Sequence, residues 1–426
     1  MNDLEVPHRA AERAARESYG KLLAYLSARC GDFDAAEDAL ADAFASALER
    51  WPRDGVPRAP EAWLLVTARH RLFDNARREQ RTERLHEHFR QAVHDAEQTF
   101  ECTDELADER LAMMFACAHP ALPPQIRGPL ILQLVLGLDA ARIASCFLIA
   151  PATMSQRLVR AKRKIAEARI PLRVPPAEEL PERLEAVLSA IYATFVEGWD
   201  DPAGFDPRSR GLVSEALWLG RIVVQACPGE PEALGLLALM LHAGARSATR
   251  RDGGGAYVPL DEQEPARWEA AAIEEAEQLL QRASGARRIG RFQLEAAIQS
   301  AHAMRRFARE PDWSAIAALY DELLRLTGSP VVALNRAVAI GASDGPCAGL
   351  AALSTIDADA RLREYQPYWA ARADLLARAG EEEAAQSAYA RAIGLTVDPS
   401  VRRYLAARAK RSRALKVRST ARSAAD

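Results

Sequence analysis

The stretch LDAARIASCFLIAPATMSQRLVRAKRK, residues 138–164, decides the kind of fold that this chain adopts. Its apolar spacing predicts two short helices joined by a tight turn. Ala144 is small enough for the helices to cross closely, and Met154 and Leu158 supply apolar contacts between them. Pro151 opens the second helix, where proline is tolerated. The arrangement is that of a helix-turn-helix, although Leu148 stands in the turn where glycine is common.

The second helix of this stretch carries side chains suited to double-stranded DNA. Hydroxyl, amide and guanidinium groups near its start fit base edges in the major groove, and later cations fit phosphates. The residues are Thr153, Ser155, Gln156 and Arg157, followed by Arg160, Lys162 and Lys164. From Arg157 to Lys164 there are five positive charges and no negative one. This favours DNA binding over the alternative of a purely structural helical hairpin.

Toward the N-terminus, the segment 34–51 predicts an amphipathic helix with an acidic face. Leu40, Phe44, Leu48 and Trp51 follow one another at steps of four, four and three and form an apolar stripe. Away from that stripe lie Asp34, Asp38 and Asp42, each four residues apart, with Glu37 beside them. Such like charges disfavour an isolated helix. They form either a solvated face or a docking surface for a basic partner.

The next predicted helix, 60–81, has the opposite character. Its cations are Arg69, His70, Arg71, Arg77 and Arg78, and Trp63 stands near its start. Cations interleaved with flat side chains suit unpaired nucleic acid, because the cations neutralise phosphates and the rings stack on unstacked bases. For Trp63 the alternative is a place in the core.

The whole chain predicts an all-α protein in three blocks. Helix-forming alanine, leucine, arginine and glutamate dominate, and no period-two strand pattern stands out. Breaks are predicted at 31–32, 52–57, 120–124, 148–151 and 171–181. The boundaries divide the chain into a leader 1–18, a first helical domain 19–82, a linker 83–107, a helix-turn-helix domain 108–172, a linker 173–183, a helical-repeat extension 184–410 and a basic disordered tail 411–426.

The extension contains a pattern of large and small residues typical of a tetratricopeptide repeat. Its order appears at Trp369, Ala373, Leu376, Gly380, Ala385, Tyr389 and Ala392. Small residues let paired helices approach, and large ones fill the space between them. A second copy spans 313–330, and 214–228 and 231–242 are degenerate candidates. The tail is strongly basic, with nine Lys or Arg and no acid between Arg402 and Arg422.

Composition excludes several other classes of protein. No apolar run approaches the ~20 residues of a membrane span, and the N-terminus lacks the pattern of a signal peptide, so we expect a cytoplasmic protein. The six cysteines are scattered without zinc spacing, and we expect neither a metal site nor a cofactor. No nucleophile–base pair or phosphate loop stands out, which argues against an enzyme. Net charge is −3, so the basic clusters are local and suggest a polyanion met at defined places.

Three motifs in this order resemble the extracytoplasmic-function class of RNA polymerase sigma factors. The segment AEDALADAF (36–44) is similar to that family's polymerase-binding helix. WLLVTARHRLFD (63–74) is similar to its helix that melts and reads the minus-ten promoter element, and TMSQRLVRAK (153–162) to its minus-thirty-five recognition helix. The resemblance covers residues 19–170. With the extension, the chain resembles the subgroup that carries a C-terminal tetratricopeptide domain.

The resemblance implies a non-enzymatic initiation factor that binds core RNA polymerase, through its β′ and β subunits, and promoter DNA. Asp38, Asp42 and Phe44 would then contact the polymerase, and the acidic face would be a docking surface. The extension would regulate the factor in cis, through an unidentified protein or small molecule. Two departures are Ala41, where glutamine is frequent, and His70, where asparagine is frequent near the flipped-base pocket.

The principal alternative is a helix-turn-helix regulator with a repeat sensor domain, acting without being a polymerase subunit. It accounts for residues 138–164 but leaves the acidic face and the helix 60–81 without a use. It also predicts DNA binding in the absence of polymerase.

Overall fold

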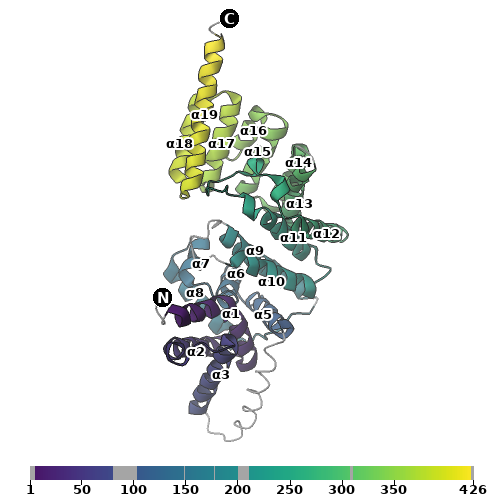
Figure 1. The fold of residues 1–426 in the computed structure, drawn as a ribbon. Coiled ribbons are helices and arrows are strands. Elements are labelled where there is room, and N and C mark those ends of the chain that lie inside the picture. The colour runs from purple at the N-terminus through teal and green to yellow at the C-terminus, as the bar shows by residue number, and fades with distance from the viewer. Residues whose placement is uncertain are drawn as a thin grey trace. The chain divides into compact units, whose positions relative to one another are not determined.

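The structure is a computed structural model that describes residues 5–79, 103–147, 149–176, 178–199, 211–307 and 310–423. These residues are overwhelmingly helical, and within them the one β-type pairing is an isolated bridge between Arg251 and Tyr257. The predicted all-α class is therefore confirmed. The chain divides into two compact units, Met1–Thr194 and Phe195–Asp426 (Figure 1).

The first three helices of the N-terminal unit pack on one another: α1 (Glu5–Cys30), α2 (Phe33–Asp54) and α3 (Pro60–Glu79). Gly31 has a positive φ of 71° and ends α1. Asp32 then caps α2, because its Oδ1 accepts hydrogen bonds from the amides of Asp34 (2.9 Å) and Ala35 (3.2 Å). The break predicted at 31–32 is where the structure has it. The helix before it begins earlier than predicted: most of the expected leader 1–18 is the first half of α1, with Ala11 and Ala14 buried.

The buried face of α2 consists mainly of small residues. Leu40 and Trp51 are buried as the predicted stripe requires, whereas Phe44 is half-buried and Leu48 is 45% exposed. The remaining buried positions include Ala36, Ala39, Ala43 and Ala47. Because α2 packs against α1 and α3 together, small side chains on its inner face allow a close approach on two sides.

The same unit continues with four further helices: α5 (Thr103–Cys117), α6 (Pro124–Leu134), α7 (Ala140–Cys146) and α8 (Pro151–Glu167). Helices α7 and α8 pack together through the buried side chains of Ile143, Ala144, Met154 and Leu158. Residues 138–164 thus contain two short helices that pack together, as their apolar spacing predicts; the turn residue Leu148 lies outside the described residues. A break between α6 and α7 was not predicted, and Gly137 adopts the positive φ of 65° that it requires.

Helix α9 (Leu180–Trp199) spans the division between the two units. It begins inside the predicted linker 173–183, directly before Pro181. Proline is compatible with the first turn of a helix, so a proline-rich boundary and a helix start coincide here.

The C-terminal unit consists of helices that pack mainly on their neighbours in sequence. They are α10 (Leu212–Ala226), α11 (Pro231–Ala245), α12 (Ala270–Ser284), α13 (Arg291–Ala303), α14 (Trp313–Thr327), α15 (Pro330–Ser343), α16 (Pro346–Ser354), α17 (Gln366–Ala379), α18 (Glu382–Leu395) and α19 (Pro399–Ser423). Helix α11 is almost wholly buried, because α10, α12 and α13 all pack on it.

The repeat pattern falls on a helical hairpin. Helices α17 and α18 pair across Gly380, whose φ is 86°. Ala373, Ala385 and Ala392 have no exposed surface and Tyr389 is buried beside them. The small residues therefore lie where the two helices approach, as the pattern predicts. The second copy likewise corresponds to α14, which pairs with α15.

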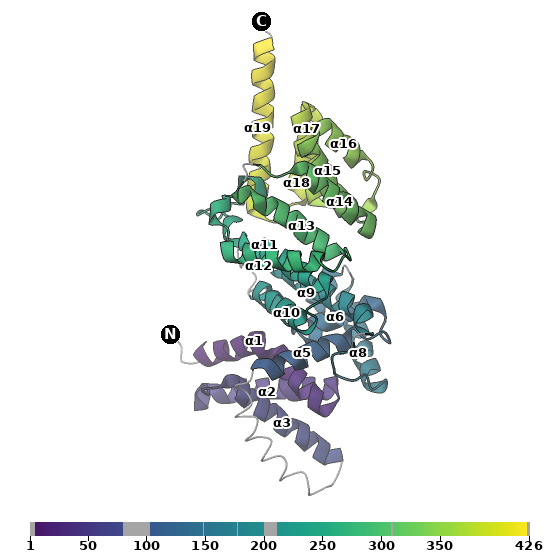
Figure 2. The ribbon, with the colours of Figure 1, turned by 90° about the vertical axis from the view of Figure 1, so that its right-hand side faces the viewer.

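The basic tail is helical, so the prediction of disorder from residue 411 was wrong for the described residues. Helix α19 continues to Ser423 and extends past the ends of α17 and α18 (Figure 2). Its first half packs on α18 through Leu405 and Ala409, and Ser412 donates a hydrogen bond to Glu382 (2.6 Å). A packed first half supplies the helix nucleus, which an isolated basic segment lacks.

Candidate functional site

The acidic face of α2 is exposed at Asp34, Asp38 and Asp42. Two of these carboxylates already face cations of the same unit. Asp42 lies 4.0 Å from the Arg71 guanidinium of α3, and Asp34 Oδ1 lies 3.0 Å from the ammonium of Lys162. Asp38 is exposed and lies four residues from each of them along α2. Phe44 is half-buried, consistent with a supporting role for this face.

Helix α3 presents some of its predicted DNA-binding residues to solvent and holds others within the bundle. Trp63 is half-buried and meets the buried Trp51 edge-on, with 5.6 Å between ring centroids. Trp63 therefore braces α3 against α2, which agrees with the core alternative. His70 and Arg71 are exposed. The side chains of Arg77 and Arg78 lie outside the described residues.

Arg69 is only partly exposed, and its guanidinium carbon lies 5.4 Å from the centre of the Tyr25 ring. Burial lowers the pKa of this arginine, the phenol of Tyr25 acts in the opposite sense, and Arg29 lowers it further. Arg69 thus belongs to a cationic pair beside an aromatic ring of α1, at the edge of the exposed α3 surface.

Helix α8 is divided into a buried stripe and an exposed face. Met154, Leu158, Ala161 and Ile165 are buried at helical spacing. The opposite face exposes Thr153, Ser155, Gln156, Arg157, Arg160 and Lys164. Pro151 occupies the first turn of the helix, and the N-cap residue Ala150 makes no side-chain hydrogen bond there. Six of the seven residues expected to contact DNA from this helix are therefore gathered on one solvent-facing surface.

Lys162 is the exception. It is only 9% exposed, and its ammonium contacts the carboxylates of Glu37 and Asp34 on α2. Burial lowers the pKa of this lysine, but the bonds to Glu37 and Asp34 outweigh burial and leave the pKa above its ordinary value. In this arrangement its charge is neutralised by protein and not presented to a phosphate. The sequence contained one signal of this burial: Lys162 lies four residues after the buried Leu158, on the same side of α8 as the apolar stripe.

Sequence reasoning also missed the residues that hold α1 against α2 and against the helices of the second half of the unit. Arg29 pairs with Glu109 of α5 at 2.9 Å, and Tyr19 donates a hydrogen bond to Glu37 (3.2 Å). Burial, followed by Glu37, raises the pKa of the Tyr19 phenol. Gly20 lies so close to the turn after α6 that a Cβ atom there would overlap the carbonyl oxygen of Val135. No sequence pattern marks such contacts.

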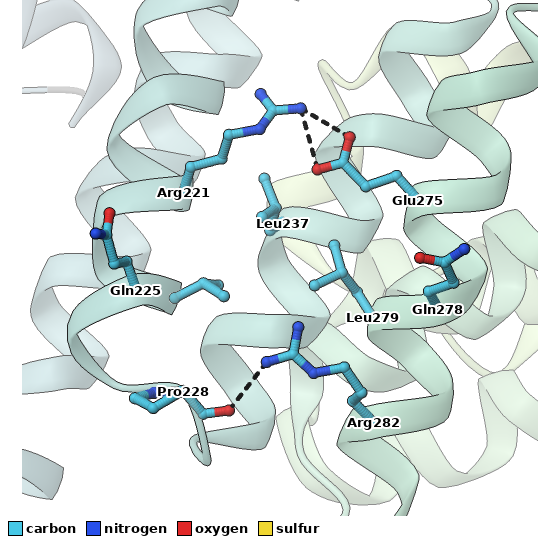
Figure 3. A pocket seen from close by; sticks show the side chains of 9 residues that line it. Arg221, Gln225, Pro228, Leu237, Glu275, Gln278, Leu279 and Arg282 are labelled. Atoms are coloured by element: carbon cyan, nitrogen blue, oxygen red, sulfur yellow. Dashed lines mark hydrogen bonds and ion pairs between the residues drawn. The ribbon is translucent and has the colours of Figure 1, made fainter.

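The C-terminal unit has an open groove of about 370 Å³ between α10 and α12, above α11 (Figure 3). Leu237 and Leu279 form part of its apolar floor. Across one side, Arg221 donates hydrogen bonds to both carboxylate oxygens of Glu275, at 3.1 and 2.8 Å. At the other, Arg282 donates to the carbonyl of Pro228 (3.3 Å). An apolar floor with polar groups at its rim is typical of a ligand groove.

Two absences apply to the described part of the chain. No group of three or more His, Cys, Asp or Glu side chains there is placed to hold a metal ion. Among the same residues, no helix is long and apolar enough to cross a membrane.

Comparison with known proteins finds two families whose models match parts of this chain. Residues 15–82, a range that contains most of α1 and all of α2 and α3, match sigma-70 region 2. Residues 183–284 match a family of unknown function (DUF6596). An uncharacterized protein of Rhizobium meliloti (strain 1021) is 38% identical over 398 residues, which is 92% of each chain. No solved structure matches this chain.

The region 2 match covers the helices that carry the acidic face and the aromatic–basic face, and it implies binding of core RNA polymerase and promoter DNA. The match to the second family begins at α9 and covers the start of the C-terminal unit. The chain thus belongs to the sigma-70 family of transcription initiation factors, as an extracytoplasmic-function-type member with a C-terminal extension.

Proposed function

We propose that this chain is an alternative sigma factor that directs core RNA polymerase to a specific set of promoters, without enzymatic activity of its own. The observation that carries the proposal is the division of α8, whose exposed face gathers base-reading and phosphate-binding groups opposite a buried stripe. That helix lies in the same compact unit as the region 2 helices. One unit can then supply polymerase and DNA contacts together, in the cytoplasm where polymerase acts.

The proposed polymerase contact is the acidic face of α2, centred on Asp38 and Asp42 and supported by Phe44. Its charge suits a cationic surface on the β′ subunit, with β as a second partner. The proposed contact with melted minus-ten DNA uses His70 and Arg71, with Arg69 at its edge and Trp63 bracing the helix; Arg77 and Arg78 remain sequence-based members. Exposed cations neutralise single-strand phosphates, and the exposure of His70 and Arg71 supports their role.

The proposed minus-thirty-five contact uses Thr153, Ser155, Gln156, Arg157, Arg160 and Lys164. The N-terminal end of a helix in the major groove places its first two turns at base edges. Arg157 and Arg160 are three residues apart and therefore share one face. They are the best-placed cations for testing DNA contact separately from polymerase contact.

The proposal is tested by reconstitution with core polymerase. The wild-type chain should comigrate with core enzyme at low salt and start transcripts at its promoter. The double variant Arg157→Ala/Arg160→Ala should lose promoter binding at least tenfold while retaining core binding, because each phosphate or base contact contributes about 1–3 kcal/mol. Arg325→Ala in α14 removes an exposed arginine elsewhere and is the matched control. Equal loss of core binding and promoter binding would instead indicate misfolding.

A second variant separates the sigma-factor proposal from a free-standing helix-turn-helix regulator. Asp38→Lys reverses a charge on the α2 face and should weaken core binding, whereas Asp344→Lys, exposed in the other unit, should not. A free-standing regulator would bind its duplex site with full affinity when polymerase is absent, and Asp38→Lys would leave its activity unchanged. That outcome would reject the proposed polymerase contact.

For the extension we propose a regulatory role in cis, built from tetratricopeptide-like helical hairpins. The support is the close packing of α17 on α18 through small residues and the open groove between α10 and α12. A protein or small-molecule regulator would bind in the groove between α10 and α12. Gln225→Trp, which places a large ring at the groove, should change promoter output in cells but not in a purified transcription reaction. An unchanged output in cells would argue against the groove.

A further inference from the structure

Lys162 of α8, the proposed DNA-reading helix, contacts the acidic face of α2, which lies much earlier in the sequence of the unit. Its partners Asp34 and Glu37 belong to α2, and Glu37 lies 125 positions away in the sequence. The lysine side chain is 10% exposed and that of Glu37 is 18% exposed, so this pair is largely shielded from water and salt. Asp34 is more exposed and adds a second carboxylate on the open side.

This contact occupies part of the surface that the proposed function assigns to polymerase. Asp34 lies one helical turn before Asp38, and Glu37 lies next to Asp38 in the sequence. The three carboxylates therefore form one acidic region of α2, and that region already binds an ammonium group. A cationic surface arriving at this region meets two carboxylates whose combined charge of −2 Lys162 has reduced to −1.

The neighbouring contacts hold α1 against α2 and against the helices that precede α8, without neutralising the two acids. Tyr19 donates a hydrogen bond to Glu37, and burial keeps its phenol protonated by raising its pKa. Gly20 against Val135 and Arg29 with Glu109 fix α1 on the helices that precede α8. Lys162 is thus the charge that closes the α2–α8 contact.

We propose that Lys162 is a latch that holds α8 on α2 in the free factor, and that core polymerase releases it by taking over Asp34 and Glu37. This proposal rests on the proposed function, in which the acidic face of α2 binds core polymerase. In the closed state the acids bind an internal cation, and in the polymerase complex they bind an external one. Polymerase binding and release of the DNA-reading helix are then coupled, since the two cations compete for the same carboxylates.

The first test measures the closed state without polymerase. Spin labels are placed at Glu49 of α2 and Val159 of α8, which are exposed, and the distance between them is measured in the full chain. The native Cys30, Cys102, Cys146 and Cys347 are replaced by alanine to make labelling specific. Lys162→Met keeps the length of the side chain and removes its charge, and should broaden and lengthen the distance distribution. Arg163→Met removes the charge of the neighbouring residue, whose side chain is 77% exposed, and should leave the distance unchanged.

A charge exchange distinguishes a latch from simple packing. Lys162→Glu alone should open the unit, because it places a third carboxylate beside Asp34 and Glu37. Adding Glu37→Lys to that variant should restore the wild-type distance. If Lys162→Met and Lys162→Glu both retain the wild-type distance, the latch does not exist. If the exchange fails to restore closure while the protein keeps its helical circular dichroism, the contact is held by packing and the proposal is overturned.

The second test uses core polymerase. Lys162→Met should bind core polymerase more tightly, on the order of tenfold. Without the ammonium, the closed state is less populated, so more of the protein has Asp34 and Glu37 available to polymerase. Arg163→Met should bind core polymerase as wild type does. Unchanged or weaker core binding by Lys162→Met, with an opened label distance, would overturn the competition. Loss of promoter binding by the core-bound Lys162→Met would place Lys162 on DNA instead.

The two tests fail independently. If wild type and all variants fail to bind core polymerase, the proposed function is wrong, and the label distances still decide whether Lys162 closes the unit. If wild type binds core polymerase and the distances do not respond to Lys162, the function stands and the latch is rejected.

Discussion

Gly20 provides a test of the N-terminal unit in which two physical effects have opposite signs. It lies inside α1, where alanine is favoured over glycine by about 1 kcal/mol. A Cβ atom at this position would lie 1.8 Å from the carbonyl oxygen and 2.7 Å from the carbonyl carbon of Val135. These are backbone atoms that cannot rotate away, and Arg110 donates a hydrogen bond to the same oxygen at 3.2 Å.

We predict that Gly20→Ala destabilises the unit or forces α1 away from the turn after α6. To reach a Cβ–oxygen contact of ordinary length, α1 and the Val135 carbonyl would have to move apart by roughly a further 1.5 Å. Overpacking of a well-packed contact costs about 1–3 kcal/mol or more. We therefore expect a net loss of about 1–2 kcal/mol after the helix-propensity gain. The side chain that would create the clash is a single methyl group.

The assay follows the N-terminal unit alone during urea unfolding. A fluorescent donor and acceptor at positions 49 and 159 both lie in this unit and report its closure. A probe confined to one unit is needed because a chain of two units need not unfold in one step. Gly128→Ala in α6 is the matched control, since its Cβ would meet only the ring of Phe147 at 3.7 Å. The control should be neutral or stabilising. A midpoint for Gly20→Ala equal to or above wild type would refute the close approach of α1 to Val135.

Three further outcomes are expected. Burial, and then Arg246, lowers the pKa of His242 to about 4, and burial, Arg246 and Arg305 do the same for His302. The unfolded chain binds these protons first, so stability of the C-terminal unit is fully present above pH 6.5 and falls as the pH drops toward 4, by roughly 3 kcal/mol per histidine. Thermal denaturation that is flat between pH 6.5 and 5 would contradict this. Ala385→Leu should destabilise the α17–α18 hairpin by about 1–3 kcal/mol, whereas the exposed Ala384→Leu should be neutral in the same melting experiment. The raised pKa of Lys162 means that its contribution is fully present below the ordinary value of 10.5 and is lost only as the pH rises above it. The distance between labels at 49 and 159 should therefore stay constant from pH 7 to about 10, and an opening below pH 9 would argue against the ammonium as the closing group.

Local sequence signals located most of the helices and the exposed face of α8. Periodicity and turn residues act over a few positions, so Gly31–Asp32, Pro151 and the Met154–Leu158 spacing were sufficient to place α2, α7 and α8. The same signals misjudged the segment from 411. Its basic composition favours disorder in isolation, but Leu405 and Ala409 of the same helix pack on α18 and the helix propagates from there.

The sequence by itself determined that the chain is helical, where its acids and cations lie along each helix, and which face of α8 points away from its apolar stripe. Only the tertiary structure decided that Lys162 leaves the DNA-facing set to join Asp34 and Glu37, and that Gly20 is the point where α1 meets Val135. Side-chain direction within a helix follows from its period, which is local. The partner of a charge depends on which helices pack together, and α2 and α8 are brought together across more than a hundred residues of chain.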